Sequence, residues 1–286
     1  MFDILLRMFA GLIRLLPRSV SLLFGVMLAD LLYYVVKLRK QVGLDNLKLA
    51  FPDKSDRDHR QILHAAYRHF GKALFDFIRM PHVMVEHLPD LFILNDEPLK
   101  SLQEQGQGAV LVSGHFGNWE YMNRALGLKG YQVAGMFVEQ HGIGGKMLGD
   151  IRAQTGSQLF GKKASPRAIL RSIKSGSIMG IASDQDAKKR GHWHTFFGQP
   201  ASRPRGPAVF ALQSNAPMIY AHCLLGADNR YSLECWEIGK EDLPDDKEQA
   251  IDQLNQRFHD ALESQVRLHP EQYFWFHRMW KTKPES

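Results

Sequence analysis

Short apolar runs alternate with amphipathic stretches through the second half of the chain. Five runs rich in β-branched and aromatic residues predict strands, at 109–113, 132–137, 177–183, 218–225 and 231–238. Stretches whose apolar residues recur every three or four positions predict helices, at about 118–128, 144–155, 165–175, 203–214 and 246–268. Strands that alternate with helices are typical of a parallel sheet covered on both faces. We therefore predict an α/β fold in which helices flank a mostly parallel central sheet.

Two segments depart from this alternation. The last two predicted strands are joined directly by the turn at 226–229, which favours an antiparallel hairpin, and we place it at an edge of the sheet. Residues 41–107 predict helices instead of strands, with a long amphipathic helix over 56–80. We therefore divide the chain into an N-terminal helical segment, 1–40, and an α/β domain, 41–286, whose first part, 41–107, is a helical lead-in.

The N-terminal segment is strongly apolar. Pro17 is expected to break its helix, and the 18 residues from Ser19 to Val36 then carry one charge, Asp30. A bilayer-spanning helix needs roughly 20 apolar residues, and a charge near its centre costs about 2.5–3.5 kcal/mol. We therefore favour helices that lie in one leaflet of a membrane. The basic run 37–40 would then face anionic headgroups on the cytoplasmic side.

Two other interpretations of this segment were weighed. Core helices of a soluble protein have the same apolar composition and stay open as an alternative. A cleaved signal peptide fits poorly, because the apolar region is too long and no cleavage site of small residues follows it.

The net charge favours an acidic partner but does not indicate which kind of partner it is. The formal net charge is +6, which suits nucleic acid, an anionic membrane surface or an acidic carrier protein. The basic run 188–190 has no interleaved aromatic residues, so we expect no nucleic-acid partner. Cys223 and Cys235 lack a metal or disulfide spacing, and we assign His192 and His194 to a surface loop; no metal site is predicted.

The candidate chemistry lies at the end of the first of these strands. His115 and Glu120 would lie ~140° apart if one helix carried both. Gly114 and Gly117 allow a sharp turn, and Asn118 is a good helix N-cap, so the imidazole and the carboxylate can converge. Such a pair is a general base with its orienting acid, without a protein nucleophile. A capped strand–helix junction with an incidental histidine is the alternative, and the spacing leaves both open.

Several sequence blocks carry a resemblance that favours the catalytic interpretation. They are Asn46–Pro52, Gly114–Glu120, Asp184-Gln-Asp186, Phe196–Ala201 with Arg205–Ala211, and Pro270–Lys281. The residues in these blocks, and the order of the blocks along the chain, resemble those of the lauroyl/myristoyl (late) acyltransferases of lipid A biosynthesis. These enzymes belong to a glycerolipid acyltransferase-like superfamily with a His-x4-Asp/Glu motif. The resemblance covers nearly the whole chain.

The resemblance implies the following function and roles. A fatty acyl chain would pass from acyl carrier protein, or coenzyme A, to a hydroxyl of a lipid A precursor, at the cytoplasmic face of the inner membrane and without a cofactor. His115 would be the base, Glu120 its partner and Arg152 a donor to the oxyanion. Asp184 and Asp186 would orient Arg152 or the acceptor. The acceptor phosphates would meet Arg205, Arg278 and Lys281, with Trp275 packed beneath them.

One segment departs from the family pattern. A Tyr-Arg-Pro-like segment is expected after the second strand, but this chain has Phe137-Val138-Glu139, which puts an acid in place of a cation. The acceptor therefore stays open: a lipid A precursor, another glycolipid or a lysophospholipid. Water as acceptor, in a thioesterase, and a binding module without activity are the further alternatives.

Overall fold

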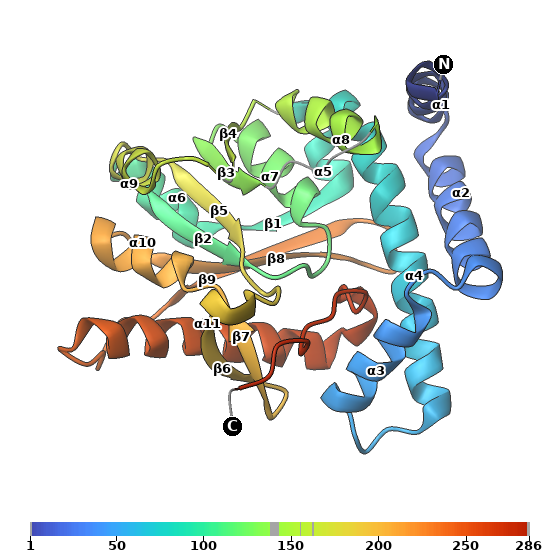
Figure 1. The fold of residues 1–286 in the computed structure, drawn as a ribbon. Coiled ribbons are helices and arrows are strands. Elements are labelled where there is room, and N and C mark those ends of the chain that lie inside the picture. The colour runs from blue at the N-terminus through green and yellow to red at the C-terminus, as the bar shows by residue number, and fades with distance from the viewer. Residues whose placement is uncertain (1, 138–142, 155, 162, 285–286) are drawn as a thin grey trace.

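In a computed structural model of the protein, which describes residues 2–137, 143–154, 156–161 and 163–284, the core is a seven-stranded sheet. Its order is β1 (Phe92–Asn95), β9 (Tyr231–Ile238), β8 (Met218–Leu225), β2 (Ala109–Ser113), β5 (Ile178–Ala182), β3 (Val133–Phe137) and β4 (Gln158–Gly161). Neighbouring strands are parallel except β8 and β9. The predicted α/β fold is confirmed (Figure 1).

The β8–β9 hairpin does not lie at the edge of the sheet, so that prediction is wrong. The short strand β1 pairs with the outer side of β9 in parallel, from Phe92 opposite Tyr231 to Asn95 opposite Glu234. A second short strand, β4, forms the opposite edge beside β3. His192 and His194 lie in another element that was not predicted, a two-stranded hairpin of β6 (His192–Phe196) and β7 (Gln199–Arg203), and His194 is buried.

Helices cover both faces of the sheet because successive strand residues point to opposite sides. Val110 and Val112 join one core cluster, with α9 (Pro166–Lys174), α10 (Gly206–Ser214) and α11 (Lys247–Leu268), whereas Leu111 joins another. That second cluster lies under α6 (Glu97–Glu104), α7 (Trp119–Leu128) and α8 (Ile143–Ala153). Short helical turns complete the described elements: α5 (Leu88–Leu91), Leu32–Val36, Met80–His82, Val85–His87, Lys188–Arg190 and Pro270–Gln272.

The N-terminal helices pack on α4 (Asp56–Arg79), the long helix beside the sheet (Figure 1). Pro17 separates α1 (Phe2–Leu15) from α2 (Arg18–Leu31), as predicted, and α3 (Lys40–Ala50) leads into α4. The axes of α2 and α4 approach closely at Gly25 and Gly71. A Cβ on Gly25 would lie 2.6 Å from the carbonyl oxygen of Gly71, so only glycine fits this crossing.

Ion pairs on both sides of this crossing join the charges of α2 to α4. The Arg18 guanidinium donates to both carboxylate oxygens of Asp76, at 2.9 and 2.7 Å. At the other end, Asp30 accepts two hydrogen bonds from Arg68, at 2.8 and 2.7 Å. The charges of α2 therefore face the protein, and its outward face is left apolar.

Candidate active site

His115 lies in the loop that follows the buried strand β2, at the carboxyl edge of the sheet, where ligands of α/β folds bind. Gly117 adopts a φ of 62° and comes so close to β8 that a Cβ would lie 2.1 Å from the carbonyl oxygen of Cys223. The Asn118 amide donates to that oxygen at 2.8 Å, and its side chain caps α7 by accepting from the Tyr121 amide at 3.1 Å. The predicted turn and N-cap are therefore confirmed, and they fix the position of His115.

Asp184 holds the imidazole from the neighbouring strand. It follows β5, and the register of Ser113 opposite Ala182 brings the ends of β2 and β5 together. His115 donates to the two oxygens of this carboxylate, from its backbone N–H at 2.8 Å and from ring Nδ1 at 2.6 Å. A neutral imidazole with its proton on Nδ1 has a lone pair on Nε2, which is the form that can act as a base.

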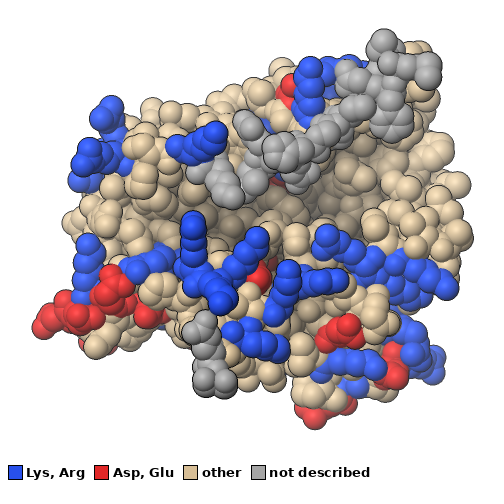
Figure 2. Space-filling view, viewed as in Figure 1, with Lys and Arg blue, Asp and Glu red and all other residues tan. Residues whose placement is uncertain are grey.

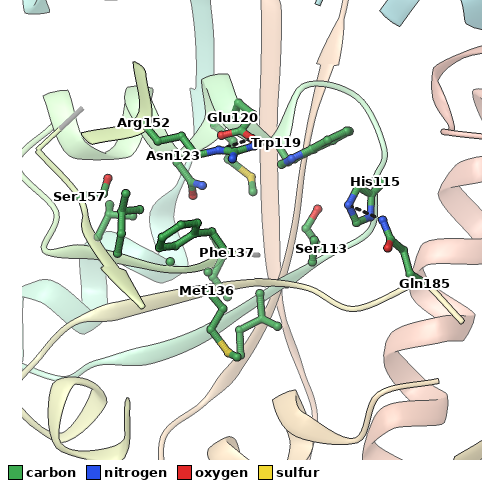
Figure 3. Close-up of a pocket in the computed structure, with 18 of the residues that line it drawn as sticks. Ser113, His115, Trp119, Glu120, Asn123, Met136, Phe137, Arg152, Ser157 and Gln185 are labelled. Atoms are coloured by element: carbon green, nitrogen blue, oxygen red, sulfur yellow. Dashed lines mark hydrogen bonds and ion pairs between the residues drawn. The ribbon is translucent and has the colours of Figure 1, made fainter. Parts of the chain in front are cut away.

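The predicted contact between His115 and Glu120 is absent, and this is a correction. Glu120 instead accepts from Arg152 of α8, whose Nε lies 2.9 Å from its Oε1. The first turn of α7 directs the Glu120 side chain toward α8, while the imidazole points to the end of β5 (Figure 3). The expectation that Asp184 would orient Arg152 is likewise wrong, because Asp184 is bonded to His115.

The surroundings of Asp184 keep it ionised. Burial by itself raises the pKa of this carboxyl group, but the His115 ring, two hydrogen bonds from His115 and the Arg203 guanidinium outweigh it, so the pKa lies well below its ordinary value. Arg203 is fully buried, with its guanidinium carbon 4.7 Å from the centre of the Phe196 ring. A buried positive charge thus lies behind the buried negative one.

Gln185 and His277 contact the other side of the imidazole. The Gln185 side-chain nitrogen lies 2.9 Å from His115 Nε2 and 2.8 Å from His277 Nε2. Burial, and to a smaller extent the nearby His115, lower the pKa of His277 to about 4, so its ring is neutral at pH 7. Neither residue was predicted. The signal was present, since Gln185 stands inside the Asp184–Asp186 block and His277 inside the Pro270–Lys281 block.

Segments far apart in sequence bring His277 to the site. The Phe274 amide donates to the His115 carbonyl at 2.9 Å, and the Gln272 carbonyl accepts from the Gly117 amide at 2.9 Å. The buried Asn46 side chain donates to the carbonyls of Trp275 and His277, at 2.7 and 2.6 Å. The first and last sequence blocks therefore meet behind the His115 loop and hold it.

A cavity of about 760 Å³ opens from His115 along one face of the sheet. Its floor is a row of four paired residues on adjacent strands, Leu111, Gly180, Gly135 and Leu159. Neither glycine has a positive φ, so backbone conformation does not require them. Among the described residues, no atom outside 134–136 lies within 4 Å of the position that a Cβ on Gly135 would take. Glycine inside a strand often marks the close approach of a ligand, and here it leaves open space beside the cavity residues Met136 and Phe137. Figure 3 shows these two side chains.

The remaining predicted site residues divide into two groups. Glu120, Arg152 and Asp186 line the cavity, and Asp186 accepts from the Thr282 hydroxyl at 3.0 Å. Four others do not line it: Arg205, which is paired with Glu248 at 2.7 Å, Trp275, which is fully buried, and the exposed Arg278 and Lys281. The Trp275 ring packs in the core against Phe51 and Phe197.

Fold and site together define a class of protein. Within the described residues, no hydroxyl or thiol is hydrogen-bonded to His115, whose ring nitrogens contact Asp184 and Gln185. The chain is thus an α/β protein with a histidine–aspartate pair at the carboxyl edge of a mostly parallel sheet, and the pair opens on a cavity lined by both apolar and polar side chains. This arrangement suits an enzyme that activates a hydroxyl of its substrate.

Comparison with known sequences gives the family. The profile of the family described as bacterial lipid A biosynthesis acyltransferase matches residues 2–282, so the chain belongs to that family and is an acyltransferase. It is 26% identical to the lipid A biosynthesis palmitoleoyltransferase of Escherichia coli K12, over 94% of this chain and 87% of that protein. It is 25% identical to the lauroyltransferase of the same organism, over 95% and 88%. The resemblance seen in the sequence blocks is confirmed.

A more distant relative acts on a different lipid class. The phosphatidylinositol mannoside acyltransferase of Mycobacterium tuberculosis CDC 1551 is 22% identical over 55% of this chain and 52% of that protein.

Proposed function

We propose that the protein transfers a fatty acyl chain from acyl carrier protein to a hydroxyl of a lipid A precursor, with His115 as general base. The observation that carries this proposal is the hydrogen bond of 2.6 Å between His115 and Asp184 at the mouth of an apolar cavity. His115 Nε2 takes the proton of the acceptor hydroxyl, and the oxygen attacks the thioester carbonyl carbon. The carbon–sulfur bond breaks, and the imidazolium returns the proton to the leaving thiolate. General base catalysis of this kind is worth about 10²–10⁴-fold.

Glu120 and Arg152 have a different role from the one the spacing suggested. The attack places negative charge on the carbonyl oxygen, and a single preorganised donor is worth about 10²–10³-fold. Arg152 lines the cavity and is held by Glu120 at 2.9 Å. We therefore assign Arg152 to the oxyanion and Glu120 to the positioning of Arg152.

The acyl chain lies over Gly135 and Gly180 in this proposal. The cavity wall combines Met122, Met136 and Phe137 with this glycine floor, and it is largely apolar beyond His115. Burial of each methylene contributes about 0.8 kcal/mol, so a dodecanoyl chain would gain roughly 8 kcal/mol. The depth of the cavity then decides which chain lengths bind.

A basic rim favours both an acidic carrier protein and a phosphorylated acceptor. Exposed basic residues stand on two segments, at 188–190 and at Arg278, Lys281 and Lys283. The bond from Thr282 to the cavity residue Asp186 joins the second segment to the loop that precedes the first. Figure 2 shows Lys and Arg side chains gathered below the hollow in this face of the molecule. The names of the relatives support a lipid A precursor first and another glycolipid second. Val138 and Glu139, the departure from the family pattern, lie outside the described residues.

We place the protein at the cytoplasmic face of the inner membrane, with α1 and α2 lying in one leaflet. The stretch Arg18–Val36 is long and apolar enough to span a bilayer, but Arg18 and Asp30 are paired with α4. A helix that crossed the bilayer over Arg18–Val36 would expose those ion pairs to lipid. Exposed apolar side chains cover the N-terminal segment instead, among them Leu12, Leu15, Leu23, Phe24, Met27 and Val35. This surface fits an interfacial anchor.

Incubation with labelled acyl carrier protein and a total lipid extract tests the proposed reaction. Mass spectrometry of the products is expected to show an acylated lipid A precursor, and the chain length with it. His115→Ala is expected to lower the rate by at least about 10²-fold while the protein stays folded. Near-normal turnover in this variant would refute the role of His115. Release of free fatty acid as the main product would favour a thioesterase.

Vesicle flotation tests the anchor. Phe24→Glu puts a charge into the apolar surface and is expected to reduce binding to vesicles that contain anionic lipid. Ile93→Glu is a matched control, because Ile93 is 43% exposed and Phe24 44%, but Ile93 lies on β1 and not on the proposed anchor helices α1 and α2. An equal effect of the two variants would argue against the anchor.

A further inference from the structure

A base that serves a lipid hydroxyl must be kept from activating water. The side chain of His115 is 19% exposed, and it lies at a cavity large enough to hold many water molecules. Water on Nε2 would be activated by the same route as the acceptor, with release of fatty acid and thiol. The structure therefore has to favour transfer over hydrolysis at this nitrogen.

The Gln185 side-chain amide stands where that water would bind. Its nitrogen carries two hydrogens, which can be donated to His115 Nε2 at 2.9 Å and to His277 Nε2 at 2.8 Å. The ring of His115 donates from Nδ1 to Asp184, so in the neutral ring that serves as base Nε2 is the acceptor. Asp184 and Gln185 are consecutive residues, and they hold the two nitrogens of one imidazole. Figure 3 shows the contact of Gln185 with His115.

The contact with His277 holds the Gln185 amide against His115 Nε2, where it acts as a cap on that nitrogen. The His277 ring is partly buried and neutral at pH 7, and in the tautomer with the proton on Nδ1 its Nε2 accepts the second amide hydrogen. Its position is fixed in turn by Asn46, which donates to its carbonyl at 2.6 Å. An amide held at both the backbone and His277 is preorganised toward His115 Nε2, so it loses little conformational freedom when it donates there.

We propose that Gln185 determines the specificity for transfer over hydrolysis: its amide caps His115 Nε2 against water and yields this nitrogen only to the hydroxyl of a bound lipid. This inference rests on the proposed acyl transfer. A net hydrogen bond is worth roughly a factor of two to ten. A lipid that already binds through its headgroup and chains can therefore displace the amide. Gln185 keeps its bond to His277 while the hydroxyl takes its place.

The same bonds form and break in acyl transfer and in hydrolysis. The two reactions differ only in whether a lipid hydroxyl or a water molecule is hydrogen-bonded to His115 Nε2. In transfer the lipid oxygen bonds to the acyl carbon, and its proton passes through His115 Nε2 to the thiolate. In hydrolysis a water oxygen bonds to that carbon, one water proton passes by the same route, and the products are fatty acid and thiol. Loss of the cap is therefore expected to raise hydrolysis and to leave the chemistry of transfer in place.

Two rates measured on one preparation test the cap. Acyl carrier protein thioester is supplied without lipid to give the hydrolysis rate, and with the lipid extract to give the transfer rate. Gln185→Ala is expected to raise hydrolysis about tenfold and to change transfer by less than about threefold. His277→Ala frees the amide without removing it, so a smaller rise in hydrolysis is expected. Gln132→Ala, an exposed glutamine outside the cavity, is the matched control and should change neither rate.

A parallel fall of both rates in Gln185→Ala, or unchanged hydrolysis, would overturn the inference and leave Gln185 a structural residue. Gln185→Asn keeps the amide, but its side chain is one methylene too short to reach both imidazoles. This variant replaces Gln185→Ala in the two assays if the alanine variant does not fold, and the same rise in hydrolysis is expected. Hydrolysis is read without any acceptor. A rise in the variant therefore supports the cap even if no lipid product forms, which would refute only the proposed transfer.

Discussion

Gly114 lies where two groups leave no space for a side chain. A Cβ at this position would be 2.7 Å from a methyl carbon of Leu262 and 3.2 Å from Asp184 Oδ2. The absence of that carbon lets the next residue, His115, bring its backbone N–H and its ring to the same carboxylate. The precision of the histidine–aspartate pair thus depends on a neighbour that takes no part in the chemistry.

Asp184→Asn is expected to lower kcat/KM by about 10³–10⁴-fold, because an amide can donate to Nδ1 and thereby leave the proton on Nε2, the wrong tautomer for a base. Glu120→Gln frees Arg152 without altering His115, so a smaller loss of about 10–10²-fold is expected. Initial rates with acyl carrier protein thioester and lipid measure both. Equal losses, or the greater loss in Glu120→Gln, would contradict the assignment of Asp184.

His115, Asp184 and Arg152 were predicted as site residues, but their pairing was not, and the contacts of Gln185 and His277 with the imidazole were missed. The glycines around His115 and the cap at Asn118 are local features, and the sequence shows them directly. Asp184 reaches the imidazole because β5 lies beside β2 in the sheet. The local sequence pattern does not predict the order of strands in a sheet. Glu120 was therefore paired with His115 because it is near in sequence, whereas Asp184 is 69 residues away.

At the scale of elements, burial decided which strands could be predicted. β2 is buried throughout, and β8 is buried at all but its last residue, so their apolar runs are clear. β1 and β4 have four residues each and only one buried residue each, so their pattern is indistinct from that of a loop. Because the sequence pattern does not predict β1, it also leads to the wrong expectation that the β8–β9 hairpin lies at the edge of the sheet.

The glycine floor of the sheet gives a prediction about chain length. Gly135→Val adds a side chain to the open space above the floor, and a β-branched residue suits the strand. Each methylene excluded from the cavity is expected to lower kcat/KM about fourfold, from 0.8 kcal/mol, so shorter chains become the preferred donors. Competition between thioesters of different lengths measures the change.

Gly161→Val is the matched control, since Gly161 pairs with Phe137 in the same sheet, has open space at its Cβ and does not line the cavity. An unchanged preference in Gly135→Val, or the same change in Gly161→Val, would show that the chain binds elsewhere.

For the molecule as a whole, buried histidines predict how stability depends on pH. Burial lowers the pKa of His69, His194, His222 and His277 to about 4, and that of His259 further. The unfolded chain binds protons at these rings near pH 6.5, whereas the folded protein does not until about pH 4. The free energy of unfolding is therefore expected to fall as the pH drops from 6.5 to 4, by up to about 1.4 kcal/mol per histidine and pH unit.

Urea unfolding in detergent at pH 7.5, 6.5, 5.5 and 4.5 measures this slope. His222→Gln removes one titrating ring and is expected to make the slope shallower by about one proton. A free energy of unfolding that stays constant from pH 6.5 to 4.5 would contradict the prediction.

The hold of residues 272–277 on the His115 loop has a consequence for the newly made chain. Translation delivers this segment after every strand of the sheet, so the nascent protein has its fold nearly complete before Gln272, Phe274 and His277 can reach the loop. Until then His115 has neither its backbone support nor the tether of its amide cap. Before residues 272–277 have been made, the enzyme is thus expected to be inactive or unselective toward thioesters, at a stage when α1 and α2 have already left the ribosome.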